Sequence, residues 1–334
     1  MVETLAIPDL SDANVIGFTG GVRPCRRGGL RIEAETLGSE VGNKVVVHNY
    51  GHGGCGVTIG LGTADEVVKI VREHSAPDES VAVLGAGVVG LTTAVRLIDA
   101  GYRVRIISEA LGTETVSAVA GALWLPTGIN EFGGDQKRLS WFHGVLRRSF
   151  DAMRSLDERY GIESLPVYEP VDAPENNEFF VPGTISNPVA LDRLPIGVYD
   201  GPGRVFETLF IHTPKYLRRL IEDICERGGV FETGRIERLQ DLGRLSEPLV
   251  VNCLAMGSRS LFDDRSMYPA RGMLVKLKPQ KLGYVKHDGY RYMFPREDAL
   301  ILGGCFLEDD WRSEPDEGIC REILREHRTF WGQA

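Results

Sequence analysis

The chain has 334 residues, of which 43% are hydrophobic, enough for a sizeable core in one large or two modest domains. Its 47 acidic and 38 basic side chains leave a formal net charge of −9, which disfavours a partner held by nucleic-acid phosphates. The longest apolar stretches are far shorter than the roughly 20 residues that a membrane-spanning helix needs. We therefore expect a folded protein with neither a nucleic acid nor a membrane as partner.

Location and redox state follow from the start of the chain and from the cysteines. Residues 1–10 lack the positive start and the long apolar core of a signal peptide, so we expect a cytoplasmic protein. The six cysteines are scattered without Cys-x-x-Cys spacing, which is not the pattern of a disulfide scaffold. Reduced, mostly buried thiols are expected.

A glycine-rich loop, 48–58, follows a predicted buried strand at 44–47 and leads into a helical pattern at 63–73. It holds four glycines within six residues, and its exposed N–H groups can converge on the polar edge of a ligand. His48 and His52 have no third metal-ligand candidate nearby, so we predict a ligand cradle and no metal site. The predicted cradle consists of Gly53, Gly54, Cys55, Gly56, Val57 and Thr58.

The strongest local signal is a buried strand at 81–84, a glycine turn and an apolar helix at 91–98. A second strand follows at 104–107, and Glu109 comes 24 residues after Gly85. This order is the complete dinucleotide-binding fingerprint, in which pyrophosphate approaches the helix N-terminus and the acid accepts from a ribose hydroxyl. The predicted nucleotide-binding residues are Gly85, Ala86, Gly87, Val88, Val89, Gly90 and Glu109. The fingerprint fits FAD and a nicotinamide cofactor equally well.

Further along, the small apolar segment 113–126 permits close approach of a flat ring, although a plain packing contact explains it as well. Segment 166–202 is rich in Pro, Gly, Asn and Asp and suggests a change of domain. Residues 213–227 read as a helix with Pro214 at its first position, and 249–257 read as a buried strand with a glycine exit.

The last third of the chain alternates in the manner of a mainly antiparallel sheet, with strands expected at 273–277, 290–294 and 300–304. Period-two alternation places Tyr290, Tyr292 and Phe294 on one face of the middle strand.

Together these segments resemble the D-amino-acid oxidase family of FAD enzymes. The resemblance is carried by His-Asn-Tyr-Gly at 48–51, Arg-Pro at 23–24, the fingerprint, 119–124 and Leu-Gly-Gly at 302–304. In that family the arginine-proline and histidine-asparagine-tyrosine-glycine segments end the chain, whereas here they precede the fingerprint. The order is therefore that of a circular permutation, with a polar linker at 72–80 joining the helix to the first fingerprint strand.

The resemblance implies an α/β fold in which a Rossmann-like FAD-binding domain adjoins a mainly antiparallel β substrate domain, in permuted order. The FAD-binding domain would comprise 41–165 and 203–262. The substrate or interface domain would comprise 1–40, 166–202 and 263–334.

The implied reaction moves a hydride from a D-amino acid to FAD, and dioxygen then reoxidises the flavin to give hydrogen peroxide. Arg23 matches the arginine that grips the substrate carboxylate, and Tyr292 matches the tyrosine that shares it. Gly54 would meet the substrate amine or the flavin edge. A second, lid-borne tyrosine has no clean match because 281–288 is short, and Tyr290 is the nearest substitute. Thr115, Ala120, Gly121, Ala122 and Leu123 complete the implied FAD site.

Several alternatives stay open. Arg23 could form a structural salt bridge, and Cys55 could carry a thioether to flavin or fill space. An oxidase of glycine, sarcosine or a secondary-metabolite amino acid would keep Arg23 in a reshaped pocket, whereas a nicotinamide dehydrogenase or a flavoprotein without oxidase activity would not need it. The partners expected are an amino acid and dioxygen, and a homodimer is the assembly considered.

Overall fold

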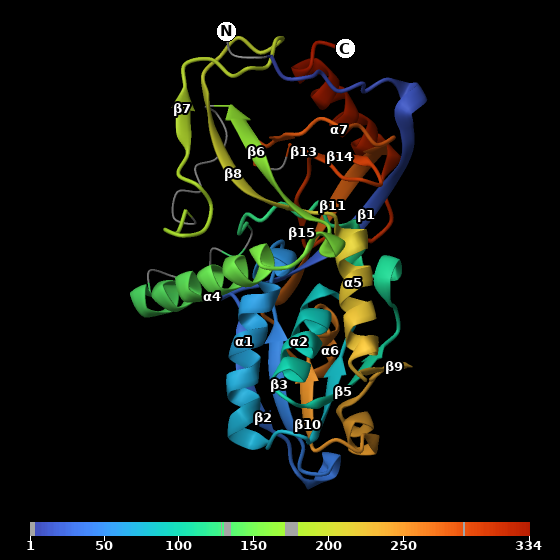
Figure 1. Cartoon of the computed structure of the whole chain (residues 1–334). Coiled ribbons are helices and arrows are strands. Elements are labelled where there is room, and N and C mark those ends of the chain that lie inside the picture. Colours follow the sequence, from blue (N-terminus) through green and yellow to red (C-terminus); the bar gives the residue numbers. More distant parts are fainter. Residues whose placement is uncertain (1–3, 128, 130–134, 171–179, 290) are drawn as a thin grey trace.

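The computed structural model describes residues 4–127, 129, 135–170, 180–289 and 291–334, and it contains two sheets (Figure 1). The smaller sheet has six strands and the larger sheet has nine. In Figure 1 the smaller sheet and its helices fill the lower half of the molecule, and the larger sheet fills the upper half. The expected α/β architecture with a mainly antiparallel second sheet is confirmed.

The smaller sheet has the strand order β2-β3-β10-β4-β5-β9. All neighbouring strands are parallel except β2, which runs antiparallel to β3 at one edge. Its strands are β2 (Arg31–Thr36), β3 (Val45–Tyr50), β10 (Leu249–Asn252), β4 (Ser80–Leu84), β5 (Arg103–Ser108) and β9 (Val230–Thr233). The strands β10 and β4 are continuous apolar runs because they are covered on both faces, as is usual in parallel sheets.

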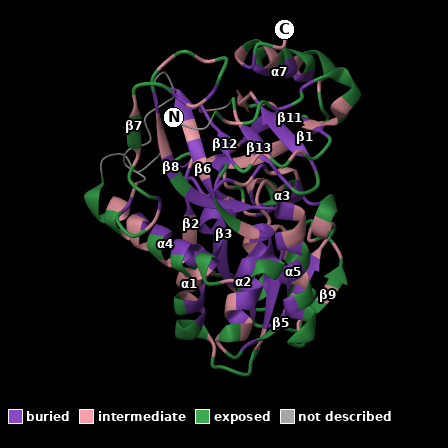
Figure 2. Ribbon diagram, turned by 45° about the horizontal axis from the view of Figure 1, so that its top comes forward, coloured by how far each residue is buried: buried purple, intermediate pink, exposed green. Residues whose placement is uncertain are grey.

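Helices cover this sheet and connect its strands. They are α1 (Gly56–His74), α2 (Val88–Asp99), α3 (Val116–Val119), α4 (Gln136–Arg154), α5 (Thr213–Glu226) and α6 (Gly257–Leu261). The remaining helix, α7 (Glu317–Phe330), packs against the larger sheet. Short 3₁₀ turns lie at Asp12–Asn14, Ser39–Val41, Gly112–Glu114, Glu158–Tyr160 and Leu239–Arg244. Helix α1 packs against both α2 and α4, and α5 packs against α2. Figure 2 shows β3, inside the smaller sheet, largely buried, and it shows the edge strand β9 and the outer face of α4 largely exposed.

The larger sheet has the order β1-β11-β14-β13-β12-β6-β8-β7, with β15 also paired to β11. Its strands are β1 (Val15–Arg26), β11 (Met267–Leu277), β14 (Leu300–Gly303), β13 (Met293–Pro295), β12 (Val285–Lys286), β6 (Ile162–Pro170), β8 (Gly203–Ile211), β7 (Val189–Leu191) and β15 (Leu307–Glu308). All pairs are antiparallel except β12 with β6. The long strand β1 supplies one edge and ends beside the smaller sheet.

One hydrophobic core joins the two sheets. It contains residues of the smaller sheet such as Val81 and Val83 together with Phe210 of β8 and Phe294 of β13. A second core, which includes Leu302 and Trp331, lies between the larger sheet and α7. Because apolar burial is the main favourable term in folding, the shared core fixes the two sheets against each other.

Two segments lie in the other sheet from the one expected. Strand β2 belongs to the smaller sheet, where all six of its residues pair with β3, although 1–40 was assigned to the substrate domain. Strand β8 belongs to the larger sheet and pairs with β6 over its nine residues, although 203–262 was assigned to the FAD-binding domain. Both strands pair with an antiparallel neighbour, β2 with β3 and β8 with β6. The apolar pattern of a segment does not show which strand it will pair with. The division into two domains stays a proposal.

The start of one predicted helix also differs from the expectation. Helix α1 begins at Gly56, so the last residues of the predicted loop form its first turn. Helix α5 begins at Thr213 with proline in its first turn, as expected. None of the helices in the described residues combines the length and the apolar character that a membrane crossing requires.

Residues near the two ends of the chain lie against each other. The Gln333 side chain accepts a hydrogen bond from the Leu10 N–H (3.0 Å) and donates one to the Pro8 carbonyl oxygen (2.6 Å). The opposite connection, 75–79 between α1 and β4, is a short, mostly exposed turn. These contacts are those that a permuted chain needs, and the permuted order itself stays a prediction.

We predict that opening the chain within 75–79 and joining residue 334 to residue 1 through a flexible linker preserves folding and flavin binding. Only surface connections change, and loop-closure entropy varies slowly with length, so the free energy of unfolding should change by about 1 kcal/mol or less. Urea unfolding and the flavin absorbance spectrum measure both properties. As a control, opening the chain between Val47 and His48 interrupts the buried strand β3 and should abolish folding. Loss of folding in the first variant would contradict the permutation.

Candidate active site

A cavity of about 910 Å³ lies where the two sheets meet. Both parts of the predicted nucleotide site line it, the turn after β4 and the loop after β3, and so does Arg23 of β1. The predicted residues on its wall are Arg23, Gly53, Gly54, Gly56, Val57, Thr58, Gly85, Ala86, Gly87, Val88, Val89, Glu109, Thr115, Ala120, Gly121, Ala122, Leu123 and Tyr292. The structure therefore brings together residues that lie up to 269 positions apart, from Arg23 to Tyr292.

The glycine turn after β4 is shaped by close backbone contacts. Gly85 has φ +96°, and a Cβ placed on it would lie 2.7 Å from the Cys253 carbonyl oxygen. Gly90 does not line the cavity, because it packs so closely on the Gly85 carbonyl that no side chain fits there. Thus glycine is required at the first position for the turn and at the third for the approach of α2 to the strand.

Two serine hydroxyls, neither of them predicted, bind N–H groups of this turn. The Ala86 N–H donates to Ser108 Oγ (3.1 Å), and the Val88 N–H donates to Ser117 Oγ (2.9 Å). These hydroxyls therefore mark the polar end of the cavity, where the N-terminus of α2 favours an anion. Neither serine belongs to the fingerprint, so the sequence carried no signal for them.

Glu109 lies at the expected end of β5 but is not isolated. Its Oε1 accepts from Arg235 Nη1 (3.0 Å), and both side chains are mostly exposed. Arg235 lines the cavity beside Glu109 and follows β9, a neighbour that the fingerprint does not specify. A ribose hydroxyl at Glu109 would therefore share the carboxylate with this arginine.

The small-residue segment around α3 forms one wall of the cavity, and Arg296 holds it in place. Arg296 Nη1 donates to the carbonyl oxygens of Ala118 (3.2 Å) and Ala120 (3.0 Å), and its other nitrogens pair with Asp298. A side chain on Gly121 would collide with Phe294. The small residues of this segment therefore serve two purposes. They allow close packing against the larger sheet, and they leave the cavity open.

Cys55 points away from the cavity that the rest of its loop lines. Its side chain is fully buried, and its Sγ–H donates to the His52 carbonyl oxygen (3.1 Å). Burial also raises the pKa of the thiol, which disfavours the thiolate. A space-filling role fits this geometry, and an attachment point for flavin does not.

His48 and His52 are both buried, and each has a local partner. The His48 ring bonds to Glu35 Oε2 (2.9 Å) and to the Asn252 side chain (3.1 Å), and His52 Nε2 bonds to Thr63 Oγ1 (3.1 Å). Burial lowers the pKa of His52 to about 3 and also lowers that of His48. Within the described residues, no three side chains of His, Cys, Asp or Glu gather in a metal-binding arrangement.

Arg23 projects from β1 into the opposite end of the cavity. Its guanidinium lies 5.3 Å from the centre of the Phe306 ring and occupies the space that Gly272 leaves by lacking a side chain. Nη1 reaches the Cys305 carbonyl oxygen at 3.5 Å, and no carboxylate of the described residues lies within the 4.0 Å of a salt bridge. The salt-bridge alternative for Arg23 is therefore not seen in the described part of the chain.

Tyr292 lies next to Arg23 at the start of β13. Its ring stacks on Phe294 at 4.3 Å and fits over Gly303, where a side chain would collide with it. Burial raises the pKa of the Tyr292 hydroxyl, while the charge of Arg23 opposes this shift. The tyrosine therefore stays a neutral hydrogen-bonding group beside a cation. Tyr290 falls outside the described residues.

Gly54 completes this end of the cavity. A Cβ on Gly54 would lie 3.4 Å from the Thr127 carbonyl oxygen and 3.7 Å from Arg23 Cδ, so the glycine backbone faces the arginine directly. Phe306, Ser313 and His287 also line the cavity and were not predicted. The first two follow strand ends in the larger sheet, and no sequence motif marks them.

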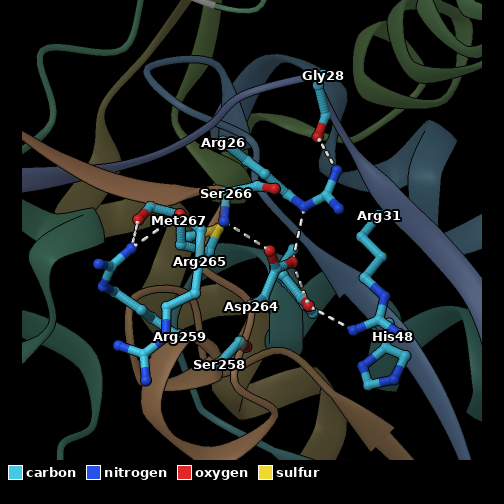
Figure 3. Close-up of polar contacts among 12 residues, drawn as sticks. Arg26, Gly28, Arg31, His48, Ser258, Arg259, Asp264, Arg265, Ser266 and Met267 are labelled. Atoms are coloured by element: carbon cyan, nitrogen blue, oxygen red, sulfur yellow. Dashed lines mark hydrogen bonds and ion pairs between the residues drawn. The ribbon is translucent and has the colours of Figure 1, made fainter.

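Asp264 pairs with Arg26 in Figure 3, and Tyr50 of the histidine-asparagine-tyrosine-glycine motif binds the same carboxylate, which anchors the loop. The Tyr50 hydroxyl donates to Asp264 Oδ2 (2.8 Å) and accepts from Arg31 Nη1 (2.9 Å). Arg26 Nε, at the end of β1, donates to the same Asp264 oxygen at 2.8 Å. Burial opposes ionisation of Asp264, but the hydrogen bonds from Arg26 and Tyr50 outweigh it and lower its pKa. One carboxylate thus joins β1 to β3.

Comparison with known proteins defines the class. The sequence model of the family described as FAD dependent oxidoreductase matches residues 80–333, and the chain belongs to this family. It is similar to a D-amino-acid oxidase of Streptomyces coelicolor, with 31% identity over 254 residues that cover 74% of this chain and 76% of that protein. It is also similar to a D-amino acid oxidase of Dugesia ryukyuensis, with 27% identity over 75% of this chain and 77% of that protein.

Two further similarities complete the comparison. A human D-aspartate oxidase is 30% identical over 255 residues, which cover 73% of each protein. A crystal structure of an FAD dependent oxidoreductase from Pseudomonas aeruginosa aligns with 77% of this chain and 75% of its own, with a TM-score of 0.42 and 15% identity.

The protein is therefore an FAD-dependent oxidoreductase, and FAD is its cofactor. The cavity fits this group, because it is elongated between an anion-favouring helix terminus and an arginine, and glycine backbone lines both places. The turn after β4 would hold the pyrophosphate, and the walls at 120–123 and 53–54 would hold the ring. The contacts of individual residues with FAD stay predictions.

We predict that Asp264→Ala lowers the free energy of unfolding by about 3 kcal/mol, because Arg26 and Tyr50 both lose a charged hydrogen-bond partner. Urea unfolding of the FAD-loaded protein measures the change. An exposed carboxylate on α4 provides the control, since Asp151→Ala removes only a surface pair with Arg154 and should change stability much less. Equal effects of the two substitutions would show that Asp264 does not anchor the loop.

Proposed function

We propose that the protein is a D-amino-acid oxidase. The net reaction converts a D-amino acid and dioxygen to an imino acid and hydrogen peroxide, and water then hydrolyses the imino acid to a 2-oxo acid and ammonia. The observation that carries this proposal is Arg23, a cation in the cavity with no carboxylate partner among the described residues and with Tyr292 beside it. The similarity to the D-amino-acid oxidases of Streptomyces coelicolor and Dugesia ryukyuensis supports the D-amino acid class.

Arg23 and Tyr292 account for substrate binding. A guanidinium presents parallel N–H donors that match a carboxylate, and a neutral tyrosine hydroxyl adds one donor. Together they would hold the α-carboxylate at the end of the cavity that Gly54 borders, which directs the α-carbon toward the ring walls at 53–54 and 120–123. FAD, when bound, supplies a two-electron acceptor.

Orientation, and not proton abstraction by a side chain, is the contribution that this site offers. Burial keeps His52 neutral, with its ring engaged by Thr63, and Tyr292 stays protonated. Fixing a reacting bond against its acceptor lowers the entropic part of the barrier without a general base. An oxidase of glycine, sarcosine or a related amine-bearing acid would use the same carboxylate clamp, so the test below includes these compounds. Cytoplasmic location and a homodimer stay predictions.

Anaerobic titration of the FAD-loaded protein tests the proposal. A D-amino acid should reduce the flavin and bleach its visible absorbance, whereas the L-enantiomer should not. With the carboxylate held by the clamp and the side chain in the cavity, only one enantiomer can turn its α-hydrogen toward the ring walls. Admission of dioxygen should restore the absorbance with formation of hydrogen peroxide. Bleaching by sarcosine or glycine alone would replace the proposal with the related amine oxidase, and no bleaching by any of them would indicate a flavoprotein without oxidase activity.

Arg23→Ala should raise the apparent KM for a D-amino acid by at least about tenfold, because loss of a charged hydrogen bond is worth about 1.5 to 3 kcal/mol. FAD content should stay unchanged, as measured by absorbance. Tyr292→Phe removes a single neutral donor and should raise KM less, by about threefold to tenfold. If Arg23→Ala retains the parent KM, Arg23 does not hold the substrate.

A further inference from the structure

His287 lines the same cavity as Tyr292. Strands β12 and β13 are antiparallel with Lys286 opposite Met293. His287 is the residue that follows β12, and Tyr292 is the residue that precedes β13. Both residues line the cavity. Lys286 faces the other way, with its ammonium 4.2 Å from the centre of the Phe330 ring of α7.

A buried carboxylate fixes the orientation of the His287 ring. His287 Nδ1 lies 2.6 Å from Glu169 Oε1, and Glu169 is only 1% exposed. Arg204 Nε donates to the second oxygen, Oε2, also at 2.6 Å. An ionised carboxylate only accepts hydrogen bonds, so the ring proton lies on Nδ1. A neutral ring then presents the lone pair of Nε2, for which the described residues supply no hydrogen-bond donor.

The carboxylates near His287 already have cationic partners without a charge on the ring. Glu169 pairs with Arg204, and Asp288 pairs with both Lys286 and Arg291. A second cation on the ring would be unmatched at a position that is only 4% exposed. Arg23 already supplies the positive charge that an α-carboxylate needs. His287 is therefore suited to act as a neutral hydrogen-bond acceptor.

We propose that His287 Nε2 accepts a hydrogen bond from the substrate side chain, so that the enzyme prefers D-amino acids whose side chains carry a hydroxyl or amide donor. The inference rests on the proposed function, because it places the α-carboxylate on Arg23 and Tyr292. Tyr292 and His287 lie at the two ends of the connection between β12 and β13. Glu169 is a positioning residue, since it acts only by fixing the ring proton. Tyr292 and Phe306 contribute aromatic rings to the lining of the same cavity.

Pairs of substrates with the same shape test the proposal on the FAD-loaded enzyme. At about pH 8, kcat/KM for D-serine should exceed that for D-2-aminobutyrate by about threefold to tenfold, because the two differ only by a hydroxyl in place of a methyl group. D-asparagine should exceed D-aspartate, which has no side-chain donor at this pH. A D-serine ratio of one, or a preference for D-aspartate, would overturn the proposal. Neither comparison depends on a variant that must fold.

Two variants test the roles of the histidine and the glutamate. His287→Phe keeps an aromatic ring but removes Nε2, so the ratio of D-serine to D-2-aminobutyrate should fall to about one. In Glu169→Gln the amide oxygen would pair with Arg204, leaving the NH₂ group to donate to Nδ1 and moving the ring proton to Nε2. This variant should therefore reverse the preference and favour D-aspartate over D-asparagine. A loss of activity without reversal would show that Glu169 has only a structural role.

An exposed histidine serves as the matched control. His74 lies in the last turn of α1, and His74→Phe should leave both substrate ratios unchanged. The outcomes separate the two proposals. Absence of flavin reduction by every D-amino acid would refute the oxidase, whereas reduction with equal ratios in the parent and in His287→Phe would refute only the side-chain site.

Discussion

The carboxylate of Asp264 is the contact on which the geometry of the cavity depends. It accepts hydrogen bonds from Arg26 at the end of β1 and from Tyr50 at the end of β3, so it ties the larger sheet to the smaller one. Three residues before Arg26 lies Arg23, and four residues after Tyr50 lies Gly54, the two groups that face each other at the substrate end. The separation of the carboxylate clamp from the glycine cradle is therefore set by one buried ion pair and its hydrogen bonds.

The two ends of the cavity differ in whether the arginine there has a carboxylate partner. Elsewhere the structure matches its buried charges, as with Glu169 and Arg204 or Lys286 and Asp288. Arg23 has no such match within the described residues, and an unpaired guanidinium in a cavity is costly. An anionic ligand offsets this cost, which is why the arginine is better explained by binding than by stability. At the opposite end Arg235 lines the cavity but is paired with Glu109, and the terminus of α2 also favours an anion there.

The sequence predicted the parts of the site that depend on backbone geometry. Gly85 and Gly54 are recognisable because turns and close approaches require glycine, and the strand, turn and helix around the fingerprint are contiguous. The sequence did not show which distant segments pair with each other as strands. Strand β8 was not recognised in the sequence, where 203–262 was placed with the FAD-binding domain, and its antiparallel register with β6 puts it in the larger sheet. Tyr292 came from family resemblance, since an aromatic residue on a strand is usually core.

His287 shows why the remaining residues were invisible in the sequence. Its function would depend on Glu169, which lies 118 positions earlier, and on Arg204, which lies on a third strand. The parallel pairing of β12 with β6 brings the first two together, and the antiparallel pairing of β6 with β8 supplies the third. The short connection between β12 and β13 then turns the histidine and the tyrosine toward one cavity. The sheet that holds Arg23 on β1 thus supplies a second polar group, His287, whose proton position is fixed by Glu169 on β6, four strands along from β11. Binding of the carboxylate and selection of the side chain can therefore vary independently.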